Sequence, residues 1–286
     1  MDRILGLKID VDTYQGMKRG VPRLLDLLGQ EGLKATFYLS IGPDASGRAI
    51  LQLLRNPLFL KKMVRTRAAS LYGYRTALYG TLLPSPMIAL SFPETVRRIV
   101  AEGHEVQFHA WDHRRWQDEV TTRPEKWVRG WFDRGIAGFE ELTGRRPNSF
   151  GAPAWLIDDR VLRIVREHSF EYLSCTRAKK PFIHEGIGLP EIPSDLPCFE
   201  ETGVDEGERL ILSELEGGGI HVLPVHAEVE GGVLGENFVR LVRAAKKMDY
   251  RLVPLRDIVP LLDRENLVTR RYRMELLPGR SVPCAV

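Results

Sequence analysis

The chain has 286 residues, of which 43% are hydrophobic and 28% charged, and its formal net charge at pH 7 is +3. This length suits one barrel-type domain of about 200–250 residues with insertions, and the composition excludes a disordered or low-complexity protein. The cysteines, Cys175, Cys198 and Cys284, are odd in number and form no CxxC pair, which favours a reducing compartment over a disulfide framework. The first residues lack a signal-peptide pattern and no run approaches roughly 18 apolar residues, so we expect a cytoplasmic protein without a spanning helix.

In chain order, short β-rich runs alternate with longer helical runs. Strand patterns occupy residues 4–10, 34–40, 104–110, 148–153, 170–175, 221–227 and 251–255; helical patterns occupy 21–32, 127–142, 158–169, 237–248 and 256–266. This alternation predicts an α/β fold with a largely parallel sheet, a (β/α) barrel of about seven strands. We expect the barrel to span residues 1–262 and a C-terminal tail to follow over 263–286. The stretch 42–93 is too long for a simple connection and predicts a lid or a docking element.

Two aspartates, Asp10 and Asp12, stand at the end of the first predicted strand. Residues two apart on a strand point to the same side, so their carboxylates share one small region. Two such charges repel unless a cation intervenes or one carboxyl is protonated, which favours a metal ligand beside a general base. The alternative is an acidic loop in which one aspartate caps the next helix.

Three histidines follow other predicted strands. His109 and His113, four residues apart, face the same way if they share a helical turn and can then ligate one divalent ion, although an isolated HxxxH is also common in cores and on surfaces. His226 closes the strand at 220–225; alone, such a histidine is more often structural. However, Asp10, His109 and His226 all lie where a strand gives way to its loop, the edge at which barrel active sites form. The sequence therefore predicts a hydrolytic centre with two histidines and one aspartate on a divalent cation.

These motifs resemble a known family. The segments Ile9–Thr13, His109–His113 and Val225–Gly231 are similar to motifs of the polysaccharide deacetylase (NodB-homology) superfamily, and most of all to its deformylases of formamido-arabinose linked to undecaprenyl phosphate. The similarity also covers Ala68–Gly73, Trp116–Gln117 and Asn237–Val239, and extends to about Pro260.

The resemblance implies a distorted (β/α) barrel and a metal-dependent hydrolase of a linear amide bond. It assigns one divalent metal ion to Asp12, His109 and His113, the general base to Asp10 and the general acid to His226. The implied reaction removes a formyl group in the pathway that adds aminoarabinose to lipid A, which supports resistance to cationic antimicrobial peptides. An N-deacetylase of another amino sugar and a non-catalytic lipid- or glycan-binding barrel remain alternatives, and the ligand set does not distinguish Zn, Co, Mn or Ni.

The chain departs from the superfamily pattern at two places. Gly151 stands where the superfamily usually has an arginine that holds the base, so the partner of Asp10 is open, with Arg177 as a candidate for the base or the substrate phosphate. No second acidic motif is evident around Pro193–Glu200, so we expect His226 to lack a carboxylate neighbour. Further candidates for substrate binding are Tyr72, Trp111, Trp155, Arg177 and Glu228.

The inserted stretch is basic, with no Asp or Glu between Ala45 and Pro93. Within Leu51–Ala89, apolar residues alternate with unopposed Lys and Arg, a pattern typical of an interfacial segment near anionic headgroups. This pattern and a lipid-linked substrate lead us to expect peripheral contact with the inner leaflet of the cytoplasmic membrane. The alternative is an ordinary helical insertion with a basic solvated face. No nucleic-acid-binding motif is present, and the oligomeric state is open.

Overall fold

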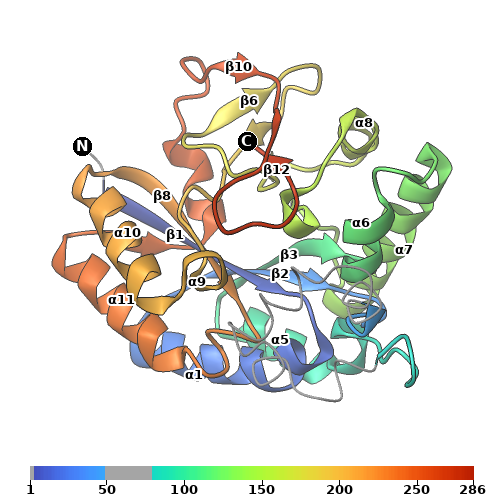
Figure 1. Cartoon of the computed structure of the whole chain (residues 1–286), viewed down its shortest axis with the longest axis horizontal. Helices are drawn as coiled ribbons and strands as arrows, with labels where there is room; N and C mark the ends of the chain where they lie inside the picture. Colours follow the sequence, from blue (N-terminus) through green and yellow to red (C-terminus); the bar gives the residue numbers. More distant parts are fainter. Residues whose placement is uncertain (1–2, 49–78) are drawn as a thin grey trace.

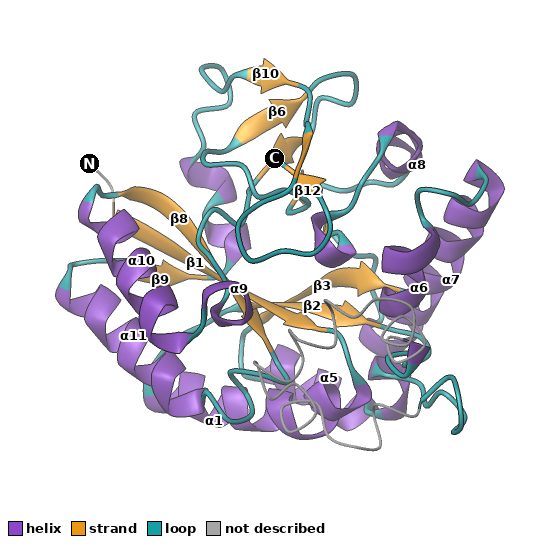
Figure 2. Cartoon of the chain, viewed as in Figure 1, coloured by secondary structure: helices purple, strands orange, loops and turns teal. Residues whose placement is uncertain are grey.

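One strongly curled sheet with helices packed around its outer surface dominates the computed structural model, which describes residues 3–48 and 79–286 (Figures 1 and 2). The strand order is β10-β6-β7-β5-β4-β3-β2-β1-β8, and β9 pairs with β1. All neighbouring strands are parallel except β6 and β7. The predicted α/β fold, a distorted barrel, is therefore confirmed. The strands are β1 (Arg3–Val11), β2 (Thr36–Ser40), β3 (Glu105–Ala110), β4 (Ser149–Phe150), β5 (Tyr172–Leu173), β6 (Phe182–His184), β7 (Pro190–Glu191), β8 (Gly219–His226), β9 (Arg251–Val253) and β10 (Thr269–Arg270).

Among residues 3–48 and 79–286 the sheet has ten strands rather than about seven. Each predicted strand is present, but β6, β7 and β10 were missed. These three have only two or three residues each, too few for a period-two pattern to be recognised. They extend the sheet beyond β5, and β10 is contributed by the C-terminal end of the chain.

Helices cover the sheet on its outside and close most connections between parallel strands (Figure 2). They are α1 (Val21–Gln30), α5 (Pro93–Ala101), α6 (His113–Glu119), α7 (Glu125–Thr143), α8 (Asp159–Glu167), α9 (Phe199–Thr202), α10 (Val204–Glu216) and α11 (Gly235–Lys247). Asp158 caps the N-terminus of α8: its Oδ1 accepts from the backbone N–H of Arg160 at 2.9 Å and of Val161 at 3.1 Å. The helix predicted over 256–266 is wrong: two short 3₁₀ turns, η5 (Leu255–Asp257) and η6 (Val259–Leu261), stand there, because Pro260 provides no N–H for a continuous helix.

Strand β1 lies at the centre of the fold and sets the register of the site. Every residue from Ile4 to Val11 is buried, as expected for a strand covered on both faces. Its first half pairs with β9 on one side and its second half with β2, while β8 pairs along its other side. In this register Asp10 is the direct neighbour of His226 on β8, so the carboxyl ends of adjacent strands bring the two predicted groups together.

The described ends of the inserted stretch, residues 42–48 and 79–93, lie against each other: Ile88 N donates to Gly42 O at 2.7 Å and Asp44 N to Pro86 O at 2.8 Å. The C-terminal segment, defined here as residues 271–286, folds back as a small hairpin of β11 (Met274–Glu275) and β12 (Cys284–Ala285), the red loop in Figure 1. Within the described residues, no helix combines the length and the hydropathy needed to cross a bilayer.

Candidate active site

Asp12, His109 and His113 converge at the carboxyl ends of β1 and β3. Asp12 Oδ1 lies 3.1 Å from His109 Nε2, and Asp12 Oδ2 lies 3.2 Å from His113 Nε2. One ligand atom from each residue falls within 4.8 Å of the others. The structure thus brings together the three residues that were expected to hold a metal.

The chemistry of this cluster fits a divalent cation. His109 Nδ1 lies 2.7 Å from the carbonyl oxygen of Gly151; a carbonyl only accepts, so Nδ1 carries the proton and Nε2 presents a lone pair. Asp12 Oδ1 and His109 Nε2 are buried and have no hydrogen-bond partner. Both atoms are acceptors, and a cation bound between them would satisfy both. Burial lowers the pKa of His113 to about 4, which keeps its imidazole neutral and able to ligate.

The two histidines do not share a helical turn, and that expectation was wrong. His109 belongs to β3, and α6 begins only at His113. Between them, Asp112 is extended and caps α6, its Oδ1 accepting from Arg115 N at 2.9 Å. The end of β3 and the start of α6 therefore bring the two imidazole rings together, with their centroids 5.2 Å apart.

Asp10 has a partner that sequence reasoning missed. Lys8 Nζ donates to both carboxylate oxygens of Asp10, at 2.6 and 2.5 Å, and the two residues are 0% and 3% exposed. The signal was present, since Lys8 is a charged residue inside an apolar strand, two positions before Asp10 and thus on the same face. A cation on β1 itself therefore contacts Asp10, the role that the superfamily pattern gives to an arginine.

The structure leaves no room for a side chain at Gly151, and Arg177 makes its contacts elsewhere than at Asp10. A Cβ at Gly151 would meet Tyr38 Cδ1 at 2.8 Å, so the Tyr38 ring fills the space that a side chain there would need. Arg177 does not contact Asp10: its guanidinium donates to Ser194 O at 2.7 Å, Leu196 O at 2.9 Å and Glu201 Oε1 at 2.7 Å. The suggestion that Arg177 holds the base is therefore wrong.

His226 also has a carboxylate neighbour, contrary to expectation. Its Nδ1 lies 2.6 Å from Glu200 Oε2. The superfamily's acidic motif is not evident in the sequence around Pro193–Glu200, because Glu200 belongs to the four-residue helix α9, whose position depends on the fold. Burial alone would lower the pKa of His226, but Glu200 outweighs it and raises that pKa well above the usual value. His226 therefore holds a proton at neutral pH.

Two further glutamates surround His226. Glu230 Oε2 accepts from the backbone N–H of His226 at 2.8 Å, and burial, with Glu200 nearby, raises the pKa of Glu230 to about 8. Burial and the charge of Asp12 raise the pKa of Glu228 well above its usual value. The Glu230 carboxyl is therefore mostly neutral at pH 7, and Glu228, a predicted substrate-binding residue, lies close enough to Asp12 and His226 to feel their charges.

The other predicted contacts lie at different distances from the centre. Trp155, in the turn η4 (Pro153–Trp155), has its ring centroid 6.5 Å from that of His226. Trp111 follows β3, and its carbonyl accepts from Gly42 N at 2.9 Å. Tyr72 lies outside the described residues.

A second group with metal-ligand spacing, Cys198, Glu200 and His226, is a poor site, because burial raises the pKa of Cys198 to about 12 and the thiol stays protonated.

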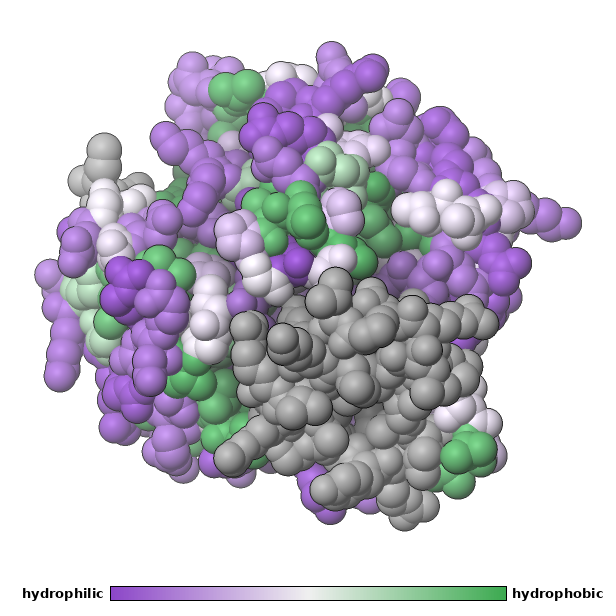
Figure 3. Space-filling model, in the orientation of Figure 1, coloured by the Kyte–Doolittle hydropathy of each residue, from purple (hydrophilic) through white to green (hydrophobic). Residues whose placement is uncertain are grey.

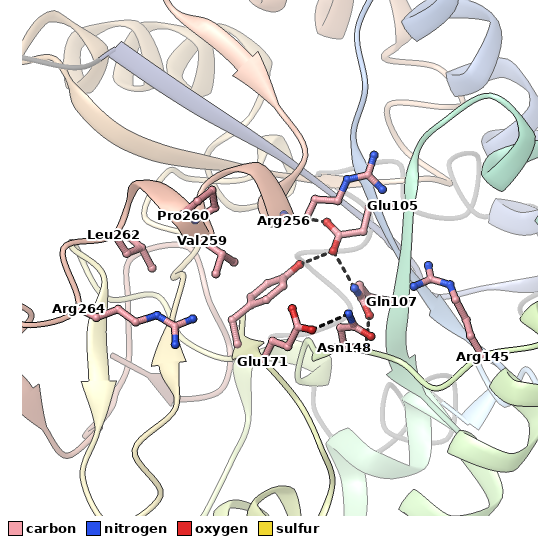
Figure 4. A pocket seen from close by; sticks show the side chains of 11 residues that line it. Glu105, Gln107, Arg145, Asn148, Glu171, Arg256, Val259, Pro260, Leu262 and Arg264 are labelled. Carbon is pink, nitrogen blue, oxygen red and sulfur yellow. Dashed lines mark hydrogen bonds between the residues drawn. The ribbon is translucent and has the colours of Figure 1, made fainter.

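A cavity of about 680 Å³ lies at the opposite ends of the strands (Figure 4). Its floor is Glu105, whose Oε1 accepts from Tyr172 Oη at 2.9 Å and from Gln107 at 2.7 Å, and whose Oε2 accepts from Arg256 N at 3.0 Å. Among the described residues, no buried polar side-chain atom of its lining lacks a partner. The described lining of the cavity therefore holds no buried unmatched polar group, unlike the cluster at the carboxyl ends, where we place the chemistry.

Comparisons with known proteins agree with this assignment. The family model "Polysaccharide deacetylase" matches residues 6–173. The chain is 36% identical over 92% of its length, and 87% of the relative's, to a probable 4-deoxy-4-formamido-L-arabinose-phosphoundecaprenol deformylase ArnD of Shewanella sediminis, and 28% identical over 93% of its length, and 96% of the relative's, to that of Wigglesworthia glossinidia brevipalpis. It shares its fold with a putative polysaccharide deacetylase from Mycobacterium smegmatis, at a TM-score of 0.67 and 20% identity over 97% of this chain and 96% of that one. The predicted enzyme class, a hydrolase of amide bonds, is confirmed, and the chain belongs to the polysaccharide deacetylase family.

Proposed function

We propose that this chain is a metal-dependent deformylase that removes the formyl group from 4-formamido-arabinose linked to undecaprenyl phosphate. The observation that carries the proposal is the arrangement of three units at one edge of the sheet: the Asp12/His109/His113 cluster, the Lys8–Asp10 pair and the Glu200–His226 pair. The substrate class is supported by the printed name of the relative at 36% identity.

In the proposed reaction, Asp10 is the general base and His226 the general acid. A divalent ion bound by Asp12, His109 and His113 would supply Lewis-acid polarisation of the formyl oxygen and of water. Lys8 contacts both carboxylate oxygens of Asp10 and so fixes its orientation while Asp10 accepts the proton of the attacking water. The water oxygen bonds to the formyl carbon, the C–N bond breaks, and formate leaves.

His226 completes the proton transfer at the leaving amine. Its Nδ1 faces Glu200, so Nε2–H is the nitrogen available to protonate the sugar amine as the C–N bond breaks. Because Glu200 keeps the His226 imidazole protonated at neutral pH, the general acid carries its proton before the reaction starts.

A lipid-linked substrate requires the site to meet a membrane. Hydrophobic side chains gather at the centre of the face in Figure 3, over the C-terminal segment, where Leu276 and Val282 are 64% and 47% exposed. Together with the basic insertion, this apolar surface supports peripheral binding to the inner leaflet of the cytoplasmic membrane and a place in lipid A modification with aminoarabinose, which underlies resistance to cationic antimicrobial peptides.

The decisive experiment compares two matched lipid-linked substrates, one N-formyl and one N-acetyl, with purified enzyme of measured metal content. We expect formate release to exceed acetate release by at least about tenfold in kcat/KM. An Asp10→Asn variant that binds metal normally controls for contaminating activity, because it lacks the base. Acetate release alone would establish the alternative, an N-deacetylase, and full turnover by Asp10→Asn would remove the mechanism.

Membrane contact is tested separately with vesicles that contain anionic lipid. Neutralising Lys61, Lys62, Arg65 and Arg67, which lie outside the described residues, is expected to reduce co-sedimentation. Equal sedimentation of the variant and the unmodified chain would reject a role for the insertion. A protein that binds such vesicles but hydrolyses neither substrate would instead be the non-catalytic lipid-binding barrel.

A further inference from the structure

The short helix α9 carries two adjacent glutamates with different partners. Glu200 meets His226, whereas Glu201 Oε1 accepts from Arg177 at 2.7 Å and from Arg280 at 3.1 Å. A helix of four residues does not hold itself in place, so these contacts set its position. Arg280 lies in the C-terminal segment, more than 50 residues further along the chain than His226.

The backbone of the C-terminal segment also contacts α9 directly. Gly279 has a φ of +81°, and a Cβ at this position would lie 2.2 Å from the carbonyl oxygen of Glu201. Only glycine permits both the backbone conformation and this approach. The segment is therefore built to lie against α9 at the residue next to Glu200.

Arg280 also links α9 to the turn η4, which carries Ala154 and Trp155. Its NH2 group donates to Ala154 O at 2.9 Å, and its guanidinium carbon lies 5.0 Å from the centroid of the Trp155 ring. Ala154 and Trp155 have φ values of 54° and 53°, a conformation that costs on the order of 1 kcal/mol or more for each residue and needs support from its surroundings. Trp155 in turn stands edge-on to His226.

We infer that Arg280 is a positioning residue, which fixes α9 from the C-terminal segment so that Glu200 meets His226. The Arg280 side chain, 10% exposed, bridges the helix that carries Glu200 and the turn that carries Trp155, and thereby sets two neighbours of the imidazole, Glu200 and Trp155. Arg177 shares Glu201, so loss of Arg280 loosens α9 without freeing it. The inference rests on the proposed function, in which His226 is the acid.

A double-mutant cycle separates positioning from general stability. Arg280→Ala is made in the wild type and in a Glu200→Gln background, and kcat and KM for formate release are measured. If Arg280 acts through Glu200, the change lowers kcat by about tenfold in the wild type, with KM within about threefold, because a small misplacement of a catalytic group is costly. In the Glu200→Gln background the same change lowers kcat by less than about twofold, since the coupled step is already lost.

Two further variants complete the design. Arg280→Lys keeps a cation for Glu201 and is expected to recover part of kcat. Arg271→Ala, in the same segment but in an exposed pair with Glu185, is expected to leave kcat unchanged. A kcat of Arg280→Ala within about twofold of the wild type, or equal losses in both backgrounds, would overturn the inference.

A readout without turnover keeps this test distinct from that of the proposed function. The emission of Trp155 is obtained as the difference between the wild type and Trp155→Phe, and Arg280→Ala is expected to shift it while Arg271→Ala does not. An enzyme that releases no formate refutes the proposed function alone, and an unshifted Trp155 emission then refutes the positioning role. If Arg280→Ala fails to fold, Arg280→Lys is carried through the same cycle.

Discussion

Removing the charge of Lys8 should destabilise the fold more than any surface substitution. Lys8→Met keeps the length of the side chain but leaves the carboxylate of Asp10, 3% exposed, without a counter-charge. Breaking a buried ion pair by removing one partner costs about 3–5 kcal/mol, a large part of a typical free energy of unfolding of about 5–15 kcal/mol. We therefore expect Lys8→Met to lose at least about 3 kcal/mol.

The double variant Lys8→Met/Asp10→Asn shows whether the pair is the cause. It buries no unpaired charge, so its free energy of unfolding should exceed the value obtained by adding the two single losses by about 2 kcal/mol or more. The assay is urea unfolding followed by circular dichroism, in the presence of a chelator, because bound metal would stabilise the native state of each variant differently. Additive losses, or a Lys8→Met as stable as the wild type, would refute the claim that Lys8 holds Asp10.

Three further predictions concern the metal, the space beside Asp10 and the pH dependence. His109→Ala should reduce bound divalent metal, measured by elemental analysis after dialysis, at least about tenfold, whereas His168→Ala, whose ring packs against Phe132 and Phe170 and is not part of the cluster, should bind as the wild type does; equal metal content in both would contradict the assignment. Gly151→Ala should cost about 1–3 kcal/mol in urea unfolding, because its Cβ would meet the Tyr38 ring at 2.8 Å, and a neutral effect would show that Tyr38 yields easily. Glu230 has a pKa of about 8 in the fold, above its value of about 4.3 in the unfolded chain, so the native state binds the extra proton and its stability falls as pH rises from about 4.5 to 8. Glu230→Gln should lack this component, by on the order of 4 kcal/mol across that range, and identical pH profiles would argue against a neutral Glu230.

The sequence by itself determined the fold class and the residues that gather at the candidate site, and the family resemblance singled out Asp12, His109 and His113 as the proposed metal ligands. The alternation of strand and helix patterns predicts a parallel sheet, and in such a sheet the residues that follow the strands meet at one edge. Asp12, His109 and His226 each follow or close a long, clearly patterned strand, so their meeting could be foreseen. Even the wrong geometry assumed for the two histidines did not change the ligand set, because His113 is only four residues from His109.

Only the tertiary structure decided which groups support the two proposed catalytic residues. Lys8 is visible in the sequence as a charge in an apolar strand, but its pairing with Asp10 depends on the burial of both on one face of β1. Glu200 and Arg280 lie in a short helix and in an irregular segment whose positions no local pattern specifies. Glu200 contacts His226 across 26 positions of the chain, and Arg280 contacts Glu201 across 79. Such contacts are set by packing rather than by periodicity.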